Sequence, residues 1–158
     1  MATLKALLIK REGNQQVVYL DKLKRLTVGI GHLVLPADKL KLGDRIDPQR
    51  VMSFFSKDTA KALAAARVQA RKAKIHDNDF IVYLASVNFQ LGPFWYKKFK
   101  KTWALVMARD YDDAAVEVQR SKWFSQTPRR VKDFQGALRR LATEAEPEKA
   151  AAQGGKSK

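Results

Sequence analysis

The sequence contains no cysteine. No disulfide bond can therefore staple the fold, and no thiolate can act as a nucleophile. Histidine is also scarce, with only two residues in the chain, and no residues stand at the spacing of a metal motif, so we expect no metal site. Phosphate-binding loops, dinucleotide fingerprints and the HExxH helix are absent as well, and we expect no cofactor.

Long apolar runs are absent too. No stretch approaches the length that spans a membrane, so no transmembrane helix is expected. The apolar block within residues 1–11 is too short and too charged for a secretory signal peptide. The sequence thus predicts a protein made in the cytoplasm without a signal peptide, which is compatible with the lack of cysteine.

Acidic residues are few compared with basic ones. The chain has 31 Lys and Arg against 16 Asp and Glu, which gives a formal net charge of +15. Such a charge attracts polyanions: nucleic acid, anionic lipid headgroups or acidic polymers of a cell envelope. Charge alone does not choose among them. Nothing in the sequence resembles a nucleic-acid-binding module, so we expect no specific nucleic-acid partner. For most individual lysines, a solubilising surface is the simpler interpretation.

The chain has 158 residues, of which 46% are hydrophobic, enough for one compact domain or two small lobes around a shared core. Residue periodicity and capping signals predict an α+β fold that is mostly helical. The expected elements are a helix from Leu4 that ends at Gly13, strands at 16–20 and 26–30, a loop at 36–43, a helix at 48–74, a helix at 77–91, a partly helical segment at 94–109, a short helix at 111–121 and a helix from Thr127.

Several features of this pattern leave alternatives open. A second helix could restart near residues 56–58. The tryptophans suit either sugar stacking or the core; helical spacing favours the core for Trp103 and Trp123, and Trp95 stays undecided. The basic helix at 128–142 could lie on a membrane or pack onto the core through its apolar stripe, and we favour packing. Residues 146–158 lack core formers, which predicts a disordered tail.

Three residues near the N-terminus form the most informative pattern. Glu12, Asp21 and Thr27 stand nine and six residues apart, across a predicted helix end and a predicted hairpin that can face each other over a cleft. Two carboxylates and a hydroxyl suit glycosidic hydrolysis, in which one acid protonates the leaving oxygen and the other steadies the attacking water. Taken singly, they would be a solvated Glu, a turn Asp and an ordinary strand Thr. Their joint spacing favours an enzyme that cuts a polysaccharide.

Three blocks of sequence extend this pattern: Glu12 to His32, Asn88 to Gly92 and Ser121 to Arg130. Together they make the chain similar to the bacteriophage lysozymes of the T-even type, glycoside hydrolase family 24, which are endolysins that hydrolyse peptidoglycan. The resemblance covers Leu7 to about Val131 and is poor between Leu33 and Ile75.

The resemblance implies a lysozyme-like, two-lobed fold in which a small antiparallel sheet and a helical lobe are joined by a long helix. The expected layout is a single catalytic domain at 1–145, with a β-containing lobe at about 12–46, a connecting helix at about 48–74 and a helical lobe at about 77–145 that includes the N-terminal helix.

The resemblance also implies roles for the three residues. Glu12 would be the general acid, Asp21 would position or activate the water on the opposite face of the sugar, and Thr27 would hold that water. The family works with inversion of configuration, so the two carboxyl groups should stand roughly 6.5–9.5 Å apart. The positions that match the sugar cleft are Leu33, Phe89, Thr102 and Glu117, the last of which replaces a neutral amide.

Supporting contacts follow from the same resemblance. Arg130 matches an arginine that pairs with the catalytic glutamate, and Gln90 with Trp123 matches a pair behind it. His32 should pair with an acid on the long helix, for which Asp58 is the best candidate, as a structural contact that ties the hairpin to that helix.

The resulting hypothesis is a muramidase that cleaves the β-1,4 bond between N-acetylmuramic acid and N-acetylglucosamine and lyses bacteria. It implies synthesis in the host cytoplasm, release to the periplasm by a holin, and action as a monomer on glycan strands, with anionic lipopolysaccharide or a membrane surface as a further partner. One alternative is a lytic transglycosylase, which manages with one acid. The other is a non-enzymatic basic protein that binds envelope polymers or nucleic acid. Asp21 and Thr27 favour water as the acceptor.

Overall fold

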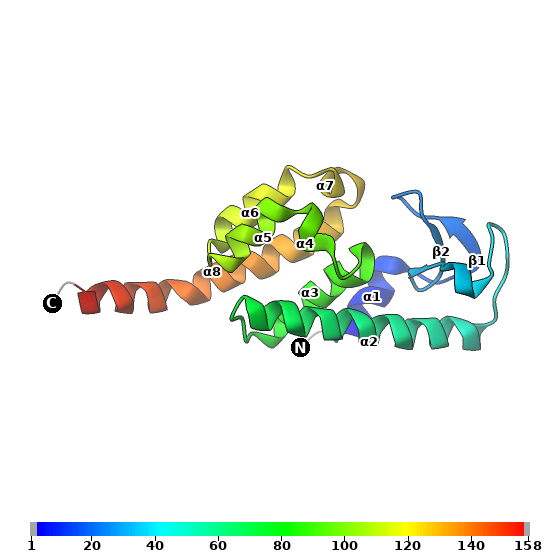
Figure 1. Ribbon diagram of the computed structural model, residues 1–158, viewed down its shortest axis with the longest axis horizontal. Helices are drawn as coiled ribbons and strands as arrows, with labels where there is room; N and C mark the ends of the chain where they lie inside the picture. The colour runs from blue at the N-terminus through cyan, green and yellow to red at the C-terminus, as the bar shows by residue number, and fades with distance from the viewer. Residues whose placement is uncertain (1–2, 157–158) are drawn as a thin grey trace.

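The computed structural model describes the backbone of residues 3–156 and the side chains of residues 3–145. The chain is mostly helical with one small antiparallel sheet near the N-terminus, which confirms the predicted α+β class. The sheet lies at one end of the long helix α2, and helices α3–α8 gather at the other (Figure 1). The elements are α1 (Leu4–Glu12), β1 (Gln15–Leu20), β2 (Leu26–Gly29), β3 (His32–Leu33), the short 3-10 helix η1 (Pro36–Asp38), α2 (Pro48–Lys72), α3 (Asn78–Leu91), α4 (Trp95–Lys98), α5 (Lys100–Met107), α6 (Tyr111–Gln119), α7 (Lys122–Gln126) and α8 (Pro128–Lys156).

Helix α1 begins and ends at residues with clear local signals. The Thr3 hydroxyl accepts a hydrogen bond from the backbone N–H of Ala6 at 3.2 Å, which is an N-cap. The helix ends at Gly13, whose φ of 69° lies in the left-handed region that glycine adopts at little cost. Glu12 is the last residue of the helix, so the position at which the helix ends fixes the position of the Glu12 side chain.

The three strands pair antiparallel in the order β1-β2-β3. The predicted hairpin is confirmed, and its turn closes where the backbone N–H of Asp21 donates to the Arg25 carbonyl at 3.0 Å. Thr27 lies in β2 opposite Tyr19 of β1 and Leu33 of β3. The sequence did not predict β3, because a strand of two residues shows no alternation of apolar and polar positions.

Helix α2 is continuous, so the alternative of a restart near residues 56–58 is wrong. Its N-terminus is capped by Asp47, whose carboxylate accepts from the backbone N–H of Arg50 at 2.7 Å. Asp58 caps nothing and instead contacts His32. Buried positions keep helical spacing through this region, at Phe55, Thr59 and Ala62, so packing favours one uninterrupted helix.

Aromatic residues fill the core of the helical lobe. Trp95 and Trp123 are both buried, and their rings lie 5.8 and 6.3 Å from the ring of Phe134. The indole N–H of Trp95 donates to Gln69 of α2 at 3.1 Å. This settles the undecided Trp95 as a core residue, whereas Trp103 is half-buried at the edge of the same cluster.

Helix α8 differs from expectation at its end. Over residues 146–156 of the segment for which we predicted a disordered tail, the backbone is helical (Figure 1). Residues 157 and 158 of that prediction lie outside the described residues. Ala, Glu, Lys and Gln dominate that segment and are good helix formers, and extending an existing helix avoids the cost of nucleation. Further back, the apolar stripe of Val131, Phe134, Leu138 and Leu141 is buried, so this helix packs onto the core as favoured. Among the described residues no helix is long and apolar enough to cross a bilayer.

Candidate active site

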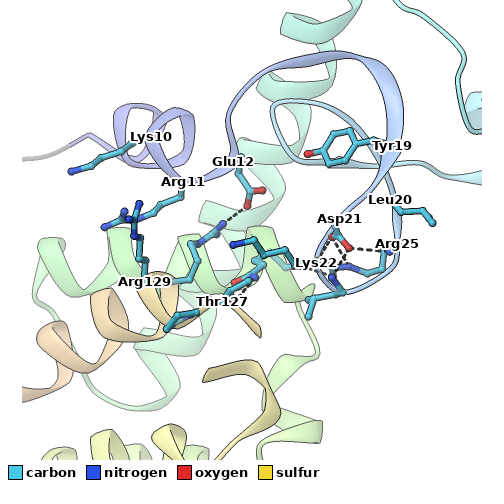
Figure 2. A pocket seen from close by; sticks show the side chains of 14 residues that line it. Lys10, Arg11, Glu12, Tyr19, Leu20, Asp21, Lys22, Arg25, Thr127 and Arg129 are labelled. Atoms are coloured by element: carbon cyan, nitrogen blue, oxygen red, sulfur yellow. Dashed lines mark hydrogen bonds and ion pairs between the residues drawn. The ribbon is translucent and has the colours of Figure 1, made fainter. Parts of the chain in front are cut away.

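Glu12 and Asp21 line the same cavity, which has a volume of about 580 Å³. The hairpin lies on one side of it, and the end of α3 and the start of α8 lie on the other. Figure 2 shows Glu12 at the end of α1 on one side and Asp21 at the hairpin turn on the other. The helix end and the hairpin therefore face a common space, as their spacing in the sequence suggested.

Glu12 is held by a residue far along the chain. The Arg130 Nη1 donates to Glu12 Oε1, and the Arg130 Nη2 donates to Ser86 at its carbonyl (2.9 Å) and its hydroxyl (3.0 Å). The Arg130 side chain is only 7% exposed. A buried guanidinium with three acceptors has little freedom to move, so it fixes the direction of the Glu12 carboxyl group. The predicted contact between Arg130 and Glu12 is present.

Gly31 makes room for Glu12. A β-carbon at this position would lie 2.6 Å from the Glu12 carboxyl carbon and 2.6 Å from its Oε2. The φ of Gly31 is also positive, at 64°, so any other residue would be strained there. The Glu12 Oε1 thus lies on the Arg130 side, and the Oε2 lies against the backbone of Gly31.

Asp21 is held by its own turn. Its Oδ1 accepts from the backbone N–H groups of Leu23 and Arg25, each at 2.9 Å. Its Oδ2 accepts from the Arg25 Nε at 3.0 Å and the Arg25 Nη2 at 2.9 Å. All of these contacts come from residues within four positions along the chain. They fix the side-chain conformation of Asp21 without any help from the helical lobe.

Thr27 lies behind the turn and is buried. Its hydroxyl donates to the Arg25 carbonyl at 2.9 Å, which uses its single hydrogen and leaves its lone pairs free to accept. The structure does not place Thr27 on the wall of the Glu12 cavity. Thr27 is therefore linked to the cavity only indirectly, through its hydrogen bond to Arg25, which does line it.

Arg25 is a site residue that the sequence did not predict. Besides its two bonds to Asp21, it donates through Nη1 to the backbone carbonyl of Gln90 at 2.7 Å. Gln90 lines the cavity from the helical lobe. Its side chain is fixed, since it accepts a hydrogen bond from the Trp123 indole at 2.8 Å and donates one to the Thr127 hydroxyl at 3.1 Å. The predicted pair of Gln90 and Trp123 is thus present. Arg25 carried no signal, being one of many basic residues.

The cavity wall also carries one aromatic and several basic side chains. Burial raises the pKa of the Tyr19 phenol, and the charges of Glu12 and Asp21 raise it further. Arg11 is bound by Asp133 at 2.7 Å, and this hydrogen bond raises the pKa of the guanidinium despite partial burial. The wall carries further positive charge on Lys10, Lys22 and Arg129.

His32 lies between two carboxylates. Its Nδ1 is 2.6 Å from Asp58 Oδ2, as predicted, and its Nε2 is 2.8 Å from Asp38 Oδ2, which the sequence did not predict. The ring stacks on Phe54 with centroids 3.8 Å apart. Burial lowers the pKa of His32, but hydrogen bonds to the two carboxylates outweigh it and the net pKa is raised. The doubly protonated ring can donate to both acids, so it joins the sheet to α2 and η1.

The predicted sugar-binding residues fall in two other cavities. Leu33 and Phe89 line one of about 210 Å³, which Gly31 and His32 also line. Since Gly31 touches the Glu12 carboxyl, this cavity begins directly beside the acid. Thr102 and Glu117 lie together in a separate cavity of about 160 Å³. There Glu117 pairs with Lys101 and Arg120, each at 3.5 Å, and neither Thr102 nor Glu117 lines the Glu12 cavity.

Comparison with known proteins agrees with this geometry. Residues 9–144 match the family described as phage lysozyme. The chain belongs to the phage lysozyme family, and it is a glycoside hydrolase of that family, whose substrate is the peptidoglycan of bacterial cell walls. The resemblance drawn from the sequence is thereby confirmed.

Individual relatives give the same picture. The chain is 29% identical to probable T4-type lysozyme 2 of Dictyostelium discoideum over 152 residues, covering 82% of this chain and 89% of that protein. It is 27% identical to probable T4-type lysozyme 1 of the same organism with the same coverage. It is 29% identical to the peptidoglycan hydrolase gp36 of Pseudomonas phage phiKMV over 116 residues, covering 73% of this chain but 12% of that protein.

Proposed function

We propose that this enzyme cleaves the β-1,4 bond between N-acetylmuramic acid and N-acetylglucosamine by an inverting mechanism, with Glu12 as the general acid. One observation carries the proposal: Glu12 and Asp21, from different elements, line one cavity of about 580 Å³. Two carboxyl groups on either side of a shared space are what glycoside hydrolysis requires. Membership of the phage lysozyme family supports peptidoglycan as the substrate.

The geometry favours Oε2 of Glu12 as the atom that donates the proton. The Oε1 is occupied by Arg130, whereas the Oε2 lies against Gly31, which also lines the cavity that holds Leu33 and Phe89. A glycan whose sugar rings rest in that second cavity would bring its glycosidic oxygen near Oε2. Protonation of the leaving oxygen there would support departure of the sugar alcohol.

Asp21 and Thr27 would serve the attacking water. In an inverting enzyme the second carboxylate accepts a proton from a water on the far face of the sugar, so the two carboxyl groups should stand roughly 6.5–9.5 Å apart with substrate bound. The Thr27 hydroxyl donates its hydrogen to the Arg25 carbonyl and keeps its lone pairs free, but it lies behind the turn. It would accept a hydrogen bond from that water once the turn at Arg25 moves aside.

The test uses Glu12→Gln, which keeps the shape of the side chain and removes the proton. Loss of turbidity of Gram-negative cells stripped of their outer membrane should slow by at least ~10²-fold, with an unchanged circular dichroism spectrum. Proton NMR of a soluble product during the first turnovers should show the inverted anomer. Lysis by Glu12→Gln at nearly the wild-type rate would show that another group is the acid.

A lytic transglycosylase is the second candidate, and one observation favours it: Asp21 has its acceptor positions filled by backbone and guanidinium donors. A transglycosylase needs no water and no second acid. The products decide between the two, because a transglycosylase leaves an anhydro sugar and a hydrolase leaves a reducing end.

The proposal extends to where and how the enzyme acts. Released to the periplasm by a holin, it would act as a monomer, and its charge of +15 would concentrate it on anionic wall polymers, lipopolysaccharide or membrane surfaces. Attraction between exposed charges is screened over roughly 8–10 Å near physiological salt, so binding to isolated envelopes should weaken steeply as salt rises. Binding that is independent of salt would reduce the charge to a solubilising role.

A further inference from the structure

The Arg25 side chain makes three hydrogen bonds at the active-site cavity, two within the hairpin and one to the helical lobe. Its Nε and Nη2 donate to Asp21 Oδ2, and its Nη1 donates to the Gln90 carbonyl, 65 residues along the chain. We call these three contacts the Arg25 bridge. Asp21, Arg25 and Gln90 all line the same cavity, so the guanidinium occupies space between the hairpin and the end of α3. Figure 2 shows Arg25 beside Asp21 at the hairpin turn.

The bridge leaves Asp21 without a free acceptor. An ionised carboxylate offers about four lone-pair positions, and here two receive backbone N–H groups and two receive guanidinium N–H groups. A water that attacks the sugar needs one of these positions. The backbone donors belong to the turn itself, so the guanidinium donors are the ones that can leave.

The helical end of the bridge is a fixed anchor. Gln90 is held through its side chain by Trp123 and Thr127, and Trp123 is buried. Among the described residues, no other hydrogen bond joins hairpin residues 15–29 to helices α3–α8. Apart from apolar packing in the shared core, the described residues thus offer one polar contact that holds the hairpin to α3 at the cavity. Arg25 is 29% exposed, so water can take over its donors when the bridge opens.

We propose that the Arg25 bridge narrows the active-site cavity of the free enzyme between the hairpin and α3, and that it must open before a glycan occupies the space beside Asp21 and Asp21 can bind the attacking water. Arg25 is then a positioning residue, which acts through Asp21 and through the distance between the lobes. This inference rests on the proposed function, because it concerns the access of substrate and water to Asp21.

Arg25→Gln tests the proposal by kinetics. The two backbone bonds to Asp21 Oδ1 do not involve the Arg25 side chain, so the turn is retained. If substrate binding must first open the bridge, only the open fraction of the enzyme binds, and removing the bridge raises that fraction. The KM for soluble peptidoglycan fragments should fall roughly threefold or more while kcat does not fall. A residue that merely supported the fold would not lower KM.

Two variants serve as comparisons. Lys24→Gln removes the same charge from the neighbouring position, which is exposed and does not line the cavity, so its KM should match the wild type. Arg25→Lys keeps the charge, but a single ammonium group cannot reproduce the fork on Asp21 together with the bond to Gln90. Its KM should therefore follow Arg25→Gln, which would show that geometry rather than charge is responsible.

A distance measurement tests the bridge independently of activity. Because the chain has no cysteine, Leu42→Cys in the β lobe and Val116→Cys on α6 place two spin labels at exposed positions, 60% and 48% accessible. Pulsed electron paramagnetic resonance should show longer distances between the two labels in Arg25→Gln than in the labelled protein that keeps Arg25. Addition of peptidoglycan fragments should lengthen the distances in the parent as well.

The outcomes separate this proposal from the proposed function. An enzyme that fails to cleave peptidoglycan overturns the proposed function, while the label distances still report whether the bridge holds the lobes together. Unchanged distances in Arg25→Gln overturn the bridge. So does a fall in kcat at unchanged KM, since Arg25 would then assist the chemistry rather than narrow the cavity.

Discussion

The two acidic residues of this site are held in opposite ways. Glu12 is fixed by Arg130, which lies 118 positions away in sequence, is buried, and is itself bound to Ser86. Asp21 is fixed by Arg25 and the backbone of its own turn, within four positions, in contacts that are partly exposed. The first arrangement gives a rigid group that depends on the whole fold. The second gives a group that forms locally and can be released locally, which fits the role proposed for Asp21 in binding the attacking water.

The largest effect expected from this comparison is on Arg130. Arg130→Met removes the buried cation and leaves Glu12 and Ser86 without their donor. Breaking one side of a buried pair should lower the free energy of unfolding by about 3 kcal/mol. Urea denaturation followed by circular dichroism measures this. A loss below about 1 kcal/mol would mean that Glu12 is not held by the fold in the way described.

Gly31 provides the next largest effect. In Gly31→Ala the new methyl group would overlap the Glu12 carboxyl and meet a φ of 64°. A displacement of the acid by about 1 Å should reduce activity by about 10²-fold. The matched control is Gly43→Ala, which has a positive φ of 88° but open space around it, so it carries the backbone strain without the overlap. Equal loss of activity in both variants would show that strain, and not the position of Glu12, is responsible.

His32 is intermediate between the two acids, because it is buried like Arg130 but contacts one near and one distant carboxylate. Its pKa is raised from 6.5 in the folded protein, so the stability it contributes is fully present below that pH and is lost as the pH rises through the folded-state pKa. The difference in unfolding free energy between wild type and His32→Asn should therefore shrink as the pH rises. A constant difference across this range would show that His32 folds uncharged.

A variant of Asp38 extends this test of pH-dependent stability to acidic pH. Burial raises the pKa of Asp38, but the Leu35 N–H and His32 outweigh burial and the net pKa lies below 3.8. The stability it contributes is present above that value and is lost as the pH falls through the folded-state pKa. In Asp38→Asn, His32 keeps only Asp58 as a charged partner, so the stability from His32 should be lost at a lower pH than in the wild type. Urea titrations at several pH values check this shift.

The same contrast between local and distant contacts explains what the sequence could predict. Capping by Thr3, Asp47 and Gly13 is local, and these helix ends were placed closely. Glu12, Asp21 and Thr27 were found by their spacing, and Arg130 by family resemblance. Arg25 was missed because its bond to Gln90 is a tertiary contact that leaves no periodic or spacing signal. Asp38 was missed although it lies only six positions from His32, because a contact across an irregular loop follows no periodic pattern either. The clash that excludes a side chain at Gly31 likewise exists only once α1 meets the sheet.

The smallest effect on the free energy of unfolding is expected at Arg25, because the fold depends least on its contact with Asp21. The Arg25 and Asp21 side chains are 29% and 18% exposed, so the pair should contribute at most about 1 kcal/mol to the free energy of unfolding. Arg25→Gln should thus leave the urea midpoint nearly unchanged, in contrast to Arg130→Met, although it removes the same charge. Raising the salt concentration should remove what little difference remains, because exposed pairs are screened and buried ones much less. A loss as large as that of Arg130→Met would mean that the hairpin needs Arg25 to fold, and that Asp21 is held as firmly as Glu12.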